Sequence, residues 1–372
     1  SKRITTEAIA ALHDANFQAN ATNLNKILTI TVRVINIIGW NYLVVTALYH
    51  KEQYRELREA YEEEISNNYD MLFDVLALAY NARTIREIKE LLYNGSPADI
   101  SHAIEMLDHF VYEDIKPVLF PVIENISPGE RIRHLQYYFP IESMTDQEII
   151  SSTLTRDYNI LSIYPRLCAM QIAINMPDFE VNHELIANLF HPNRLLREVA
   201  ATVIHKINPM LYESVAERLD PQIRLQLKDT LNMVEKGEKM LLIDKFRLLK
   251  NSEKFYQMQE NLLIEFAHTF TEIKYAEGTT IDLRQHMKEH ALFLLVKGTL
   301  HFLGEGIQHE EDTDGQLFYA NVLLNSGITN VTFREETILL TIDDESIEEL
   351  LFDYTEVAHC VLNCVEQFKI AG

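Results

Sequence analysis

Two groups of residues in the last third of the chain have types and spacings that could hold a metal ion. His286 and His290 are four residues apart, so they could point the same way on a helix. One histidine and four carboxylates gather shortly afterwards, at His309, Glu310, Glu311, Asp312 and Asp314. Hard divalent cations prefer carboxylate oxygens, but this spacing matches no complete metal-binding loop. We therefore interpret the acidic cluster as the solvated tip of a hairpin and predict no metal site.

Cys360 and Cys364 are one helical turn apart, as a redox or metal pair could be. Their apolar neighbours favour a core helix instead, because buried thiols behave as small hydrophobic groups. The sequence contains no phosphate-binding glycine loop, no nucleophile elbow and no His-Glu-x-x-His helix. We therefore expect no enzymatic activity and no cofactor, although side chains far apart in the sequence could still meet in space.

Composition indicates a soluble globular protein with more than one domain. The chain has 372 residues, of which 47% are hydrophobic and 24% are charged. Its 56 acidic and 33 basic residues give a formal net charge of -23, which would repel nucleic acid and anionic lipid headgroups. The three cysteines, Cys168, Cys360 and Cys364, form neither a metal-ligand set nor a disulfide framework. This usage is typical of a reducing compartment, and the cytoplasm is the expected location.

The most apolar segment runs from Ile27 to Tyr49, but Arg33, Asn36 and Asn41 interrupt it. A membrane-spanning helix needs about 20 predominantly apolar residues. The segment therefore predicts a buried or interfacial helix. Because the sequence starts at Ser1 and shows no targeting signal, we expect it to be part of a larger protein.

Three regions are predicted along the chain: an N-terminal helical region (1–95), helical repeats (96–237) and a β-rich domain (238–372). The first region contains a clear amphipathic helix, in which Tyr54, Leu57, Tyr61 and Ile65 recur every three to four residues. The second contains units of two short helices with a proline at the turns, at 98–124 and 178–208. Paired helices with a period of about 40 residues are typical of stacked α-solenoids.

The turn Pro192-Asn193-Arg194, followed by Arg197 and Glu198, resembles the pattern of HEAT and armadillo-like repeats. The resemblance implies that each helix pair buries its apolar face by stacking on its neighbour. An irregular helical bundle remains the alternative. The fold class that we predict is mainly α, an α-solenoid followed by a β-roll with flanking helices.

The β-rich domain shows several strand signals. A strand is expected at 273–281 with a glycine turn, and two more at 291–296 and 299–303, which we interpret as a hairpin around Lys297-Gly298. A further strand is expected at 337–342, and closing helices at 347–368.

The order of these landmarks resembles the cyclic-nucleotide-binding β-roll. The resemblance rests on Tyr275-Ala-Glu-Gly278, on 293–298 and on 336–343, and it covers roughly residues 238–372. In that family a short cassette carries a Gly-Glu pair for the ribose and an arginine for the cyclic phosphate. The corresponding segment here, 317–327, contains no glutamate and no arginine. Arg334 is the only guanidinium nearby, and by position it belongs to the next strand.

Two interpretations of the missing cassette glutamate and arginine stay open. In the first, the roll has lost its nucleotide and acts as an interaction module. In the second, an apolar pocket takes an uncharged or differently held ligand. The candidate ligand-binding residues are Phe318, Tyr319, Val322, Leu323 and Arg334.

The whole arrangement is similar to the cytosolic tail of bacterial transporters related to the ATP/ADP carrier branch of the major facilitator superfamily. The residues that carry this second resemblance are Glu59–Ile65, Leu72–Tyr80, Ile85, Ala103–Asp108 and the roll. It implies a non-catalytic regulatory region on the cytoplasmic side of a membrane, whose partner is the transmembrane domain of the same parent protein or another protein. A genuine nucleotide sensor that controls transport is the alternative. No transport residues can be carried over, and we expect no nucleic-acid partner.

Overall fold

The computed structural model describes residues 2–140, 142–157, 160–176, 179–237, 239–252, 255, 258, 260–286, 291–304, 307–311, 315–354 and 357–358. The chain forms two compact units. The first comprises Ser1–Pro192 and Val199–Val215, and the second comprises Asn193–Glu198 and Ala216–Gly372. The boundaries near residues 95 and 237 that the sequence suggests stay predictions.

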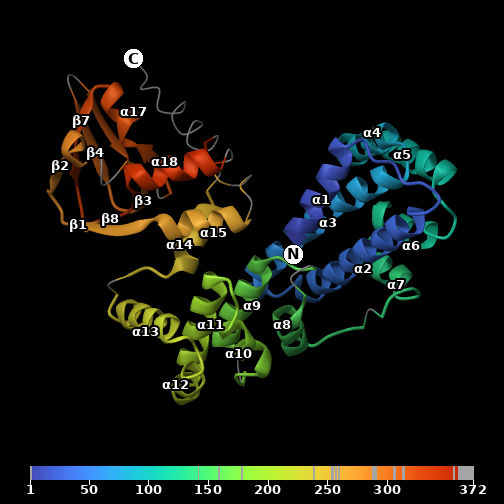
Figure 1. The fold of residues 1–372 in the computed structure, drawn as a ribbon, viewed down its shortest axis with the longest axis horizontal. Coiled ribbons are helices and arrows are strands. Elements are labelled where there is room, and N and C mark those ends of the chain that lie inside the picture. The colour runs from blue at the N-terminus through green and yellow to red at the C-terminus, as the bar shows by residue number, and fades with distance from the viewer. Residues whose placement is uncertain are drawn as a thin grey trace. The chain divides into compact units, whose positions relative to one another are not determined.

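The first unit is helical throughout its described part (Figure 1). Its helices are α1 (Lys2–Asp14), α2 (Leu24–Leu48), α3 (Arg55–Ala79), α4 (Ala82–Asn94), α5 (Pro97–Phe110), α6 (Lys116–Ile123), α7 (Pro128–Leu135), α8 (Asp146–Thr155), α9 (Ile163–Asn175), α10 (His183–Leu189) and most of α11 (Arg194–Ile207) and α12 (Pro209–Ala216), with a 3-10 turn at Glu52–Tyr54. The helix pairs predicted at 98–124 and 178–208 correspond to α5 with α6 and to α10 with α11. The helices predicted at these two places are therefore present, whereas their stacking as an α-solenoid stays a prediction.

The apolar segment around Trp40 forms α2, which packs against α3 and contributes to the core of the first unit. Among the described residues, α2 is the one helix whose length and composition would suffice to cross a membrane. Within its most apolar stretch, 61% of the residues are buried inside the structure, as in the core helix of a globular unit. Trp40 is 8% exposed, and its ring packs edge-on against that of Tyr61 at a centroid distance of 5.4 Å.

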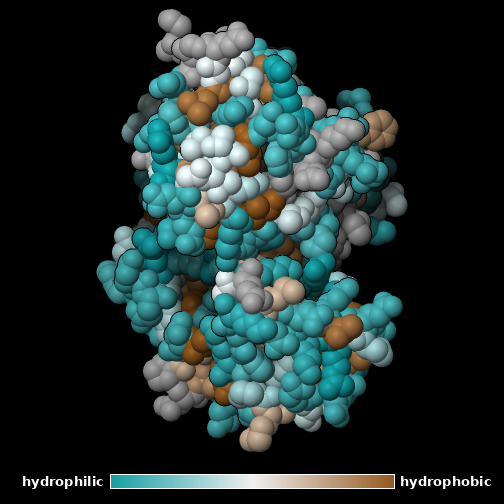
Figure 2. Space-filling view, turned by 90° about the vertical axis from the view of Figure 1, so that its left-hand side faces the viewer, coloured by the Kyte–Doolittle hydropathy of each residue, from teal (hydrophilic) through white to brown (hydrophobic). Residues whose placement is uncertain are grey.

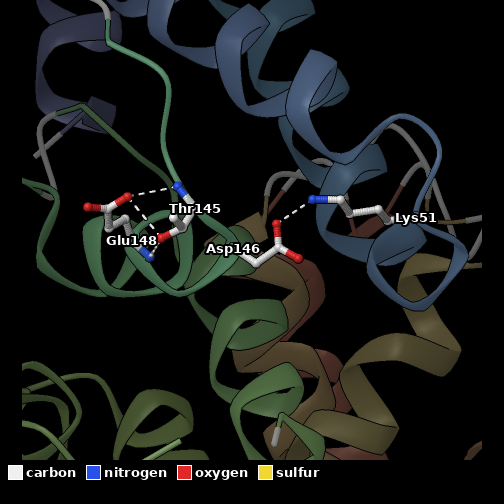
Figure 3. Close-up of polar contacts among 4 residues, drawn as sticks. All are labelled: Lys51, Thr145, Asp146 and Glu148. Atoms are coloured by element: carbon white, nitrogen blue, oxygen red, sulfur yellow. Dashed lines mark hydrogen bonds and ion pairs between the residues drawn. The ribbon is translucent and has the colours of Figure 1, made fainter.

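A charged contact and a capping box fix the start of α8 (Figure 3). Lys51, which follows α2, forms an ion pair with Asp146 in the first turn of α8. Just before this turn, the hydroxyl of Thr145 accepts from the backbone N–H of Glu148, whose carboxylate accepts from the backbone N–H of Thr145 at 2.7 Å. The reciprocal bonds satisfy amide groups that a helix start leaves without partners.

The second unit contains helices followed by a β-roll (Figure 1). The helices before the roll are α13 (Pro221–Glu235), α14 (Leu242–Lys250) and α15 (Glu260–Thr269). The strands are β1 (Thr271–Tyr275), β2 (Thr280–Asp282), β3 (Leu292–Lys297), β4 (Leu300–Gly304), β5 (Ile307–Glu311), β6 (Leu317–Tyr319), β7 (Ile328–Phe333) and β8 (Thr337–Ile342), with α16 (Leu283–His286), α17 (Ala320–Asn325) and α18 (Asp344–Asp353). They form two four-stranded antiparallel sheets, ordered β1-β8-β3-β6 and β2-β7-β4-β5. The predicted β-roll is therefore present.

The hairpin predicted at 291–303 is wrong, because its two strands belong to different sheets. β3 pairs with β6 and β8, whereas β4 pairs with β5 and β7. The chain changes sheets at Gly298, whose φ is +114°. An added Cβ there would lie 2.4 Å from Oγ1 of Thr337, so only glycine lets the chain turn this closely against β8. Both predicted strands exist, but the turn between them is a crossover.

Apolar side chains from both sheets fill the inside of the roll. Four successive residues of β3, Leu292–Leu295, are buried, so both faces of this strand are covered. On the face of the molecule that Figure 2 shows, hydrophilic residues predominate among the described ones, and hydrophobic residues are scattered between them.

Candidate functional site

The segment that the sequence aligns with a nucleotide cassette forms β6 and the short helix α17. The helix ends at Asn325, and Gly327 follows two residues later with a φ of +87°. A Cβ added to Gly304 at the end of β4 would lie 2.1 Å from the carbonyl oxygen of Gly327. The turn that follows α17 therefore lies directly on the backbone of β4. The roll keeps a helix at the cassette position, although the segment lacks the charged residues of a cassette.

Phe318 and Leu323 belong to the core of the roll, and each is 1% exposed. Phe318 lies opposite Phe293 in the β3–β6 pair, and the two rings are stacked at a centroid distance of 5.3 Å. The ring of Phe318 also lies 5.0 Å from that of Phe302 on β4. Phe318 thus joins the two sheets by aromatic packing.

Tyr319 and Val322 are partly buried on the outer side of the same segment. The hydroxyl of Tyr319 accepts a hydrogen bond of 3.5 Å from Nδ2 of Asn321. The structure therefore divides the four apolar candidates into two core residues and two partly accessible ones.

Arg334 and α17 lie at opposite ends of β7. The helix α17 precedes the first residue of this strand, and Arg334 follows its last residue. Its Nη2 donates to Nδ1 of His301 on β4 at 2.9 Å, and its backbone N–H donates to the carbonyl of Thr299 at 3.0 Å. The guanidinium is exposed at the turn between β7 and β8. The structure thus does not bring Arg334 together with the other four candidates, and the ligand-binding role of the five residues stays a prediction.

The first amide of α17 also has a protein partner. Helix N-terminal amides can bind phosphate when they point into a free site. Here the N–H of Ala320 donates to the carbonyl oxygen of Ala291 at 2.8 Å. The segment therefore offers neither a guanidinium nor this amide to an anion.

The inside of the roll contains a cavity of about 10 Å³. Its walls are formed by Tyr275, Ile281, Leu283, His286, Phe293, Val331, Phe333, Leu339 and Thr341. The rings of Tyr275 and Phe333 are stacked at 4.1 Å and close one side. A cavity of this size holds about one water molecule, whereas small-molecule sites usually measure about 300–1,000 Å³. The interior of the roll in this conformation is too small for a nucleotide.

A larger cavity of about 330 Å³ in the same unit contains most of the charged groups that sequence reasoning missed. Its walls include Arg194 and Glu198, which the sequence analysis noted only as part of a repeat turn, and Lys239, Lys245, His268 and Glu272. These residues are too far apart in the sequence to form a motif. The chain has a net charge of -23, and only the fold shows that several of its basic side chains lie around one cavity.

Within the described part of the chain, no group of three or more His, Cys, Asp or Glu residues could hold a metal ion. Several residues of the groups weighed in the sequence analysis lie outside the described residues: His290, Asp312, Asp314, Cys360 and Cys364. Cys168 is buried in α9, as expected for a thiol that acts as a small hydrophobic group.

No protein-family model and no curated protein matches this sequence. Several solved structures are similar to part of it. The Thermus thermophilus catabolite activator protein is 22% identical with a TM-score of 0.26, over 31% of this chain and 57% of that protein. A regulatory subunit of a cAMP-independent protein kinase A from Trypanosoma cruzi, bound to guanosine, is 16% identical with a TM-score of 0.26, over 34% of this chain and 47% of that one.

A cyclic nucleotide-binding-like protein from Brucella abortus is 17% identical with a TM-score of 0.21, over 29% of this chain and 98% of that one. These structural neighbours are cyclic-nucleotide-binding-like domains. Because identities and TM-scores are low, the description of the roll depends on its own strand pairing.

Proposed function

We propose that the chain is a non-catalytic regulatory and interaction region of a membrane transporter, in which HEAT-like helical repeats carry a β-roll that no longer takes a cyclic nucleotide. The helix pairs α5 with α6 and α10 with α11 support the repeat part, because their spacing matches the repeat pattern of the sequence. The partner in this proposal is the transmembrane domain of the same parent protein, and the location is the cytoplasmic side of the membrane.

The observation that carries the loss of the nucleotide is the state of the cassette segment. Residues 317–327 contain no carboxylate or guanidinium, and Phe318 and Leu323 occupy the space between the sheets. A cyclic phosphate needs a paired cation or free amides when it is taken out of water. This segment has no cation, the first amide of α17 is bonded to the carbonyl of Ala291, and the adjoining cavity of about 10 Å³ leaves no room for a base and a ribose.

A thermal-shift titration of the full chain with cyclic AMP, cyclic GMP, ATP and ADP tests the proposal for the roll. A ligand at 100 times its dissociation constant stabilises the folded state by about 2.7 kcal/mol. We expect no saturable rise in Tm that depends on residues of the roll. A rise that saturates and is lost in the Tyr319→Ala variant would contradict the proposal.

The alternative, a small-ligand sensor that controls transport, is favoured by one observation. α17 is retained between β6 and β7, at the place where a cassette helix is expected. A sensor would need the roll to open, since its present cavity is small. Only this alternative predicts saturable binding of a nucleotide or nucleoside inside the roll.

The transporter context has a separate test. The complete reading frame that encodes this chain is expected to include a polytopic membrane domain. A transport assay in liposomes should then show that deletion of this region changes the regulation of transport and leaves the substrate unchanged. A complete reading frame without membrane-spanning segments would overturn the transporter part of the proposal.

A further inference from the structure

The larger cavity of the second unit lies beside the first turn of α11, the start of α14, the end of α15 and the start of β1. We call it the basic cavity, after the basic residues in its wall: Arg194, Lys239, Lys245 and His268. Glu198, Glu272, Met233, Met240, Leu242, Phe270 and Thr271 complete the wall. All these residues belong to the second unit.

The two carboxylates of the basic cavity are already engaged with the protein. Glu198 accepts a hydrogen bond of 2.6 Å from the backbone N–H of Leu242, and Glu272 accepts one of 2.5 Å from that of Met240. Lys274 also lies 3.6 Å from Glu272. The two carboxylates therefore hold the chain at and just before the start of α14. Part of their capacity to accept hydrogen bonds is used within the protein.

The basic groups, in contrast, have more donors than the protein uses. Nζ of Lys245 has three N–H donors, and the structure gives it one bond, to the carbonyl of Phe270 at 2.5 Å. Arg194 has five donors, of which one contacts Nε2 of His268. Lys239 is exposed at the rim and makes no hydrogen bond within the described part of the chain. Surplus donors facing a cavity suit a ligand that carries several acceptors.

Burial disfavours the positive charge of Lys245 when no ligand is bound. Lys245 is 5% exposed. Its pKa is lowered, first by burial and then by repulsion from Lys239. The pKa of His268 is lowered as well, by burial and by the nearby Arg194. An anion in the basic cavity would oppose these effects, because it favours the charged forms.

The volume of about 330 Å³ is at the lower end of the usual range for small-molecule sites, about 300–1,000 Å³. The apolar side chains of Met233, Leu242 and Phe270 can contact an organic part of the ligand. A carboxylate brings one negative charge, whereas a phosphate monoester brings up to two and three acceptor oxygens. Three basic side chains, Arg194, Lys239 and Lys245, match the phosphate better.

We propose that the basic cavity binds a small phosphorylated metabolite, with its phosphate held by Arg194, Lys239 and Lys245. The planar guanidinium of Arg194 can hold two phosphate oxygens at once. The proposal does not depend on the proposed function, because it concerns a cavity outside the roll interior, and either can fail alone.

Isothermal titration calorimetry of the full chain tests the proposal, with inorganic phosphate and glycerol 3-phosphate as probes and glycerol as the uncharged control. Arg194→Gln and Lys239→Met alter exposed side chains of the cavity, so both variants should fold. Lys228→Met changes an exposed lysine of α13 outside the cavity and is the matched control. We avoid a Lys245 variant, because loss of its bond to Phe270 could unfold the region.

We expect glycerol 3-phosphate to bind more tightly than inorganic phosphate, and glycerol not to bind. Arg194→Gln should weaken binding about tenfold or more, since a charged hydrogen bond contributes about 1.5–3 kcal/mol. Lys239→Met should weaken it less, and Lys228→Met should leave it unchanged. Absence of binding, or equal binding by all variants, would overturn the proposal. A nucleotide-induced thermal shift that disappears in Arg194→Gln would support the basic cavity, whereas one that persists would place the nucleotide elsewhere.

Discussion

The carboxylate of Glu198 on α11 accepts a hydrogen bond of 2.6 Å from the backbone N–H of Leu242, the first residue of α14. The residue before this helix, Leu241, cannot cap it with a side-chain hydrogen bond. A carboxylate 44 positions earlier in the chain therefore does so. Glu198 is 6% exposed, so burial disfavours its negative charge, and the bond from Leu242 offsets only part of this effect.

The first prediction concerns the pH dependence of this contact. Burial raises the pKa of Glu198 above its ordinary value of 4.5, while the bond from Leu242 partly opposes the shift. The folded state therefore binds this proton more readily than the unfolded state, and the contribution of Glu198 to stability increases as the pH falls toward 4.5. Glu198→Gln keeps an acceptor oxygen and removes the titration, so stability should vary less over this window.

Urea unfolding followed by circular dichroism between pH 4.5 and about 7 measures the effect. Glu217→Gln, at an exposed position of the same unit, is the control and should retain the dependence of the unsubstituted chain. If the free energy of unfolding had the same pH dependence in Glu198→Gln and in the unsubstituted chain, Glu198 would have the same pKa in the folded and unfolded states. That result would contradict the prediction.

The second prediction concerns the start of α8. Thr145→Ala removes the hydroxyl that accepts from the N–H of Glu148, and it should lower the free energy of unfolding by about 1 kcal/mol. The carboxylate of Glu148 accepts hydrogen bonds from the backbone N–H and the hydroxyl of Thr145, and these bonds lower its pKa. The stabilising charge is therefore present above the ordinary pKa and is lost as the pH falls through the lowered one. Thr155→Ala, at the other end of α8, is the control and should cost less in urea unfolding.

The third prediction separates a packing role from a ligand-binding role at β6. Phe318→Ala should lower the free energy of unfolding by about 3–5 kcal/mol, because it removes a ring that contacts both sheets. Val322→Ala, in the same segment but only partly buried, should cost clearly less. Equal and small losses in urea unfolding would mean that Phe318 is not needed for packing.

The fourth prediction concerns the crossover between the sheets. Gly298→Ala places a Cβ on a backbone whose φ is already +114° and brings it within 2.4 Å of Oγ1 of Thr337, so we expect a large loss of Tm and of soluble yield. Gly315→Ala has a φ of +81° but open space around the added Cβ. This control should lose only about 1–2 kcal/mol, the cost of the left-handed backbone. Similar losses at both positions would exclude the contact with Thr337 as a cause.

Local patterns were sufficient to predict much of this fold. The proline turns and the apolar spacing at 98–124 and 178–208 predicted helices that the structure contains. The strands at 291–296 and 299–303 were also recognisable, but alternation of side chains does not say which strand is the neighbour. The predicted hairpin failed because the positive φ of Gly298 and the closeness of Thr337 direct the chain into the other sheet.

The sites were harder to predict than the strands. Landmarks on both sides aligned the segment 317–327 with a nucleotide cassette, and the structure has β6 and the short helix α17 there. The basic cavity was missed, since Arg194 and Lys245 are far apart in the sequence and each resembles an ordinary surface charge there. Only the tertiary fold shows that Lys245 is 5% exposed.

The contact between Gly304 and Gly327 affects how the roll can transmit a signal. Gly327, two residues after the end of α17, lies against main-chain atoms of β4, and the next residue, Ile328, is paired with Gly304 in the sheet. A displacement of α17 that moved Gly327 would therefore also disturb the pairing of β4 with β7. The chain that follows α17 is tied to the sheet at this point, so a force applied here reaches the strands of the roll directly.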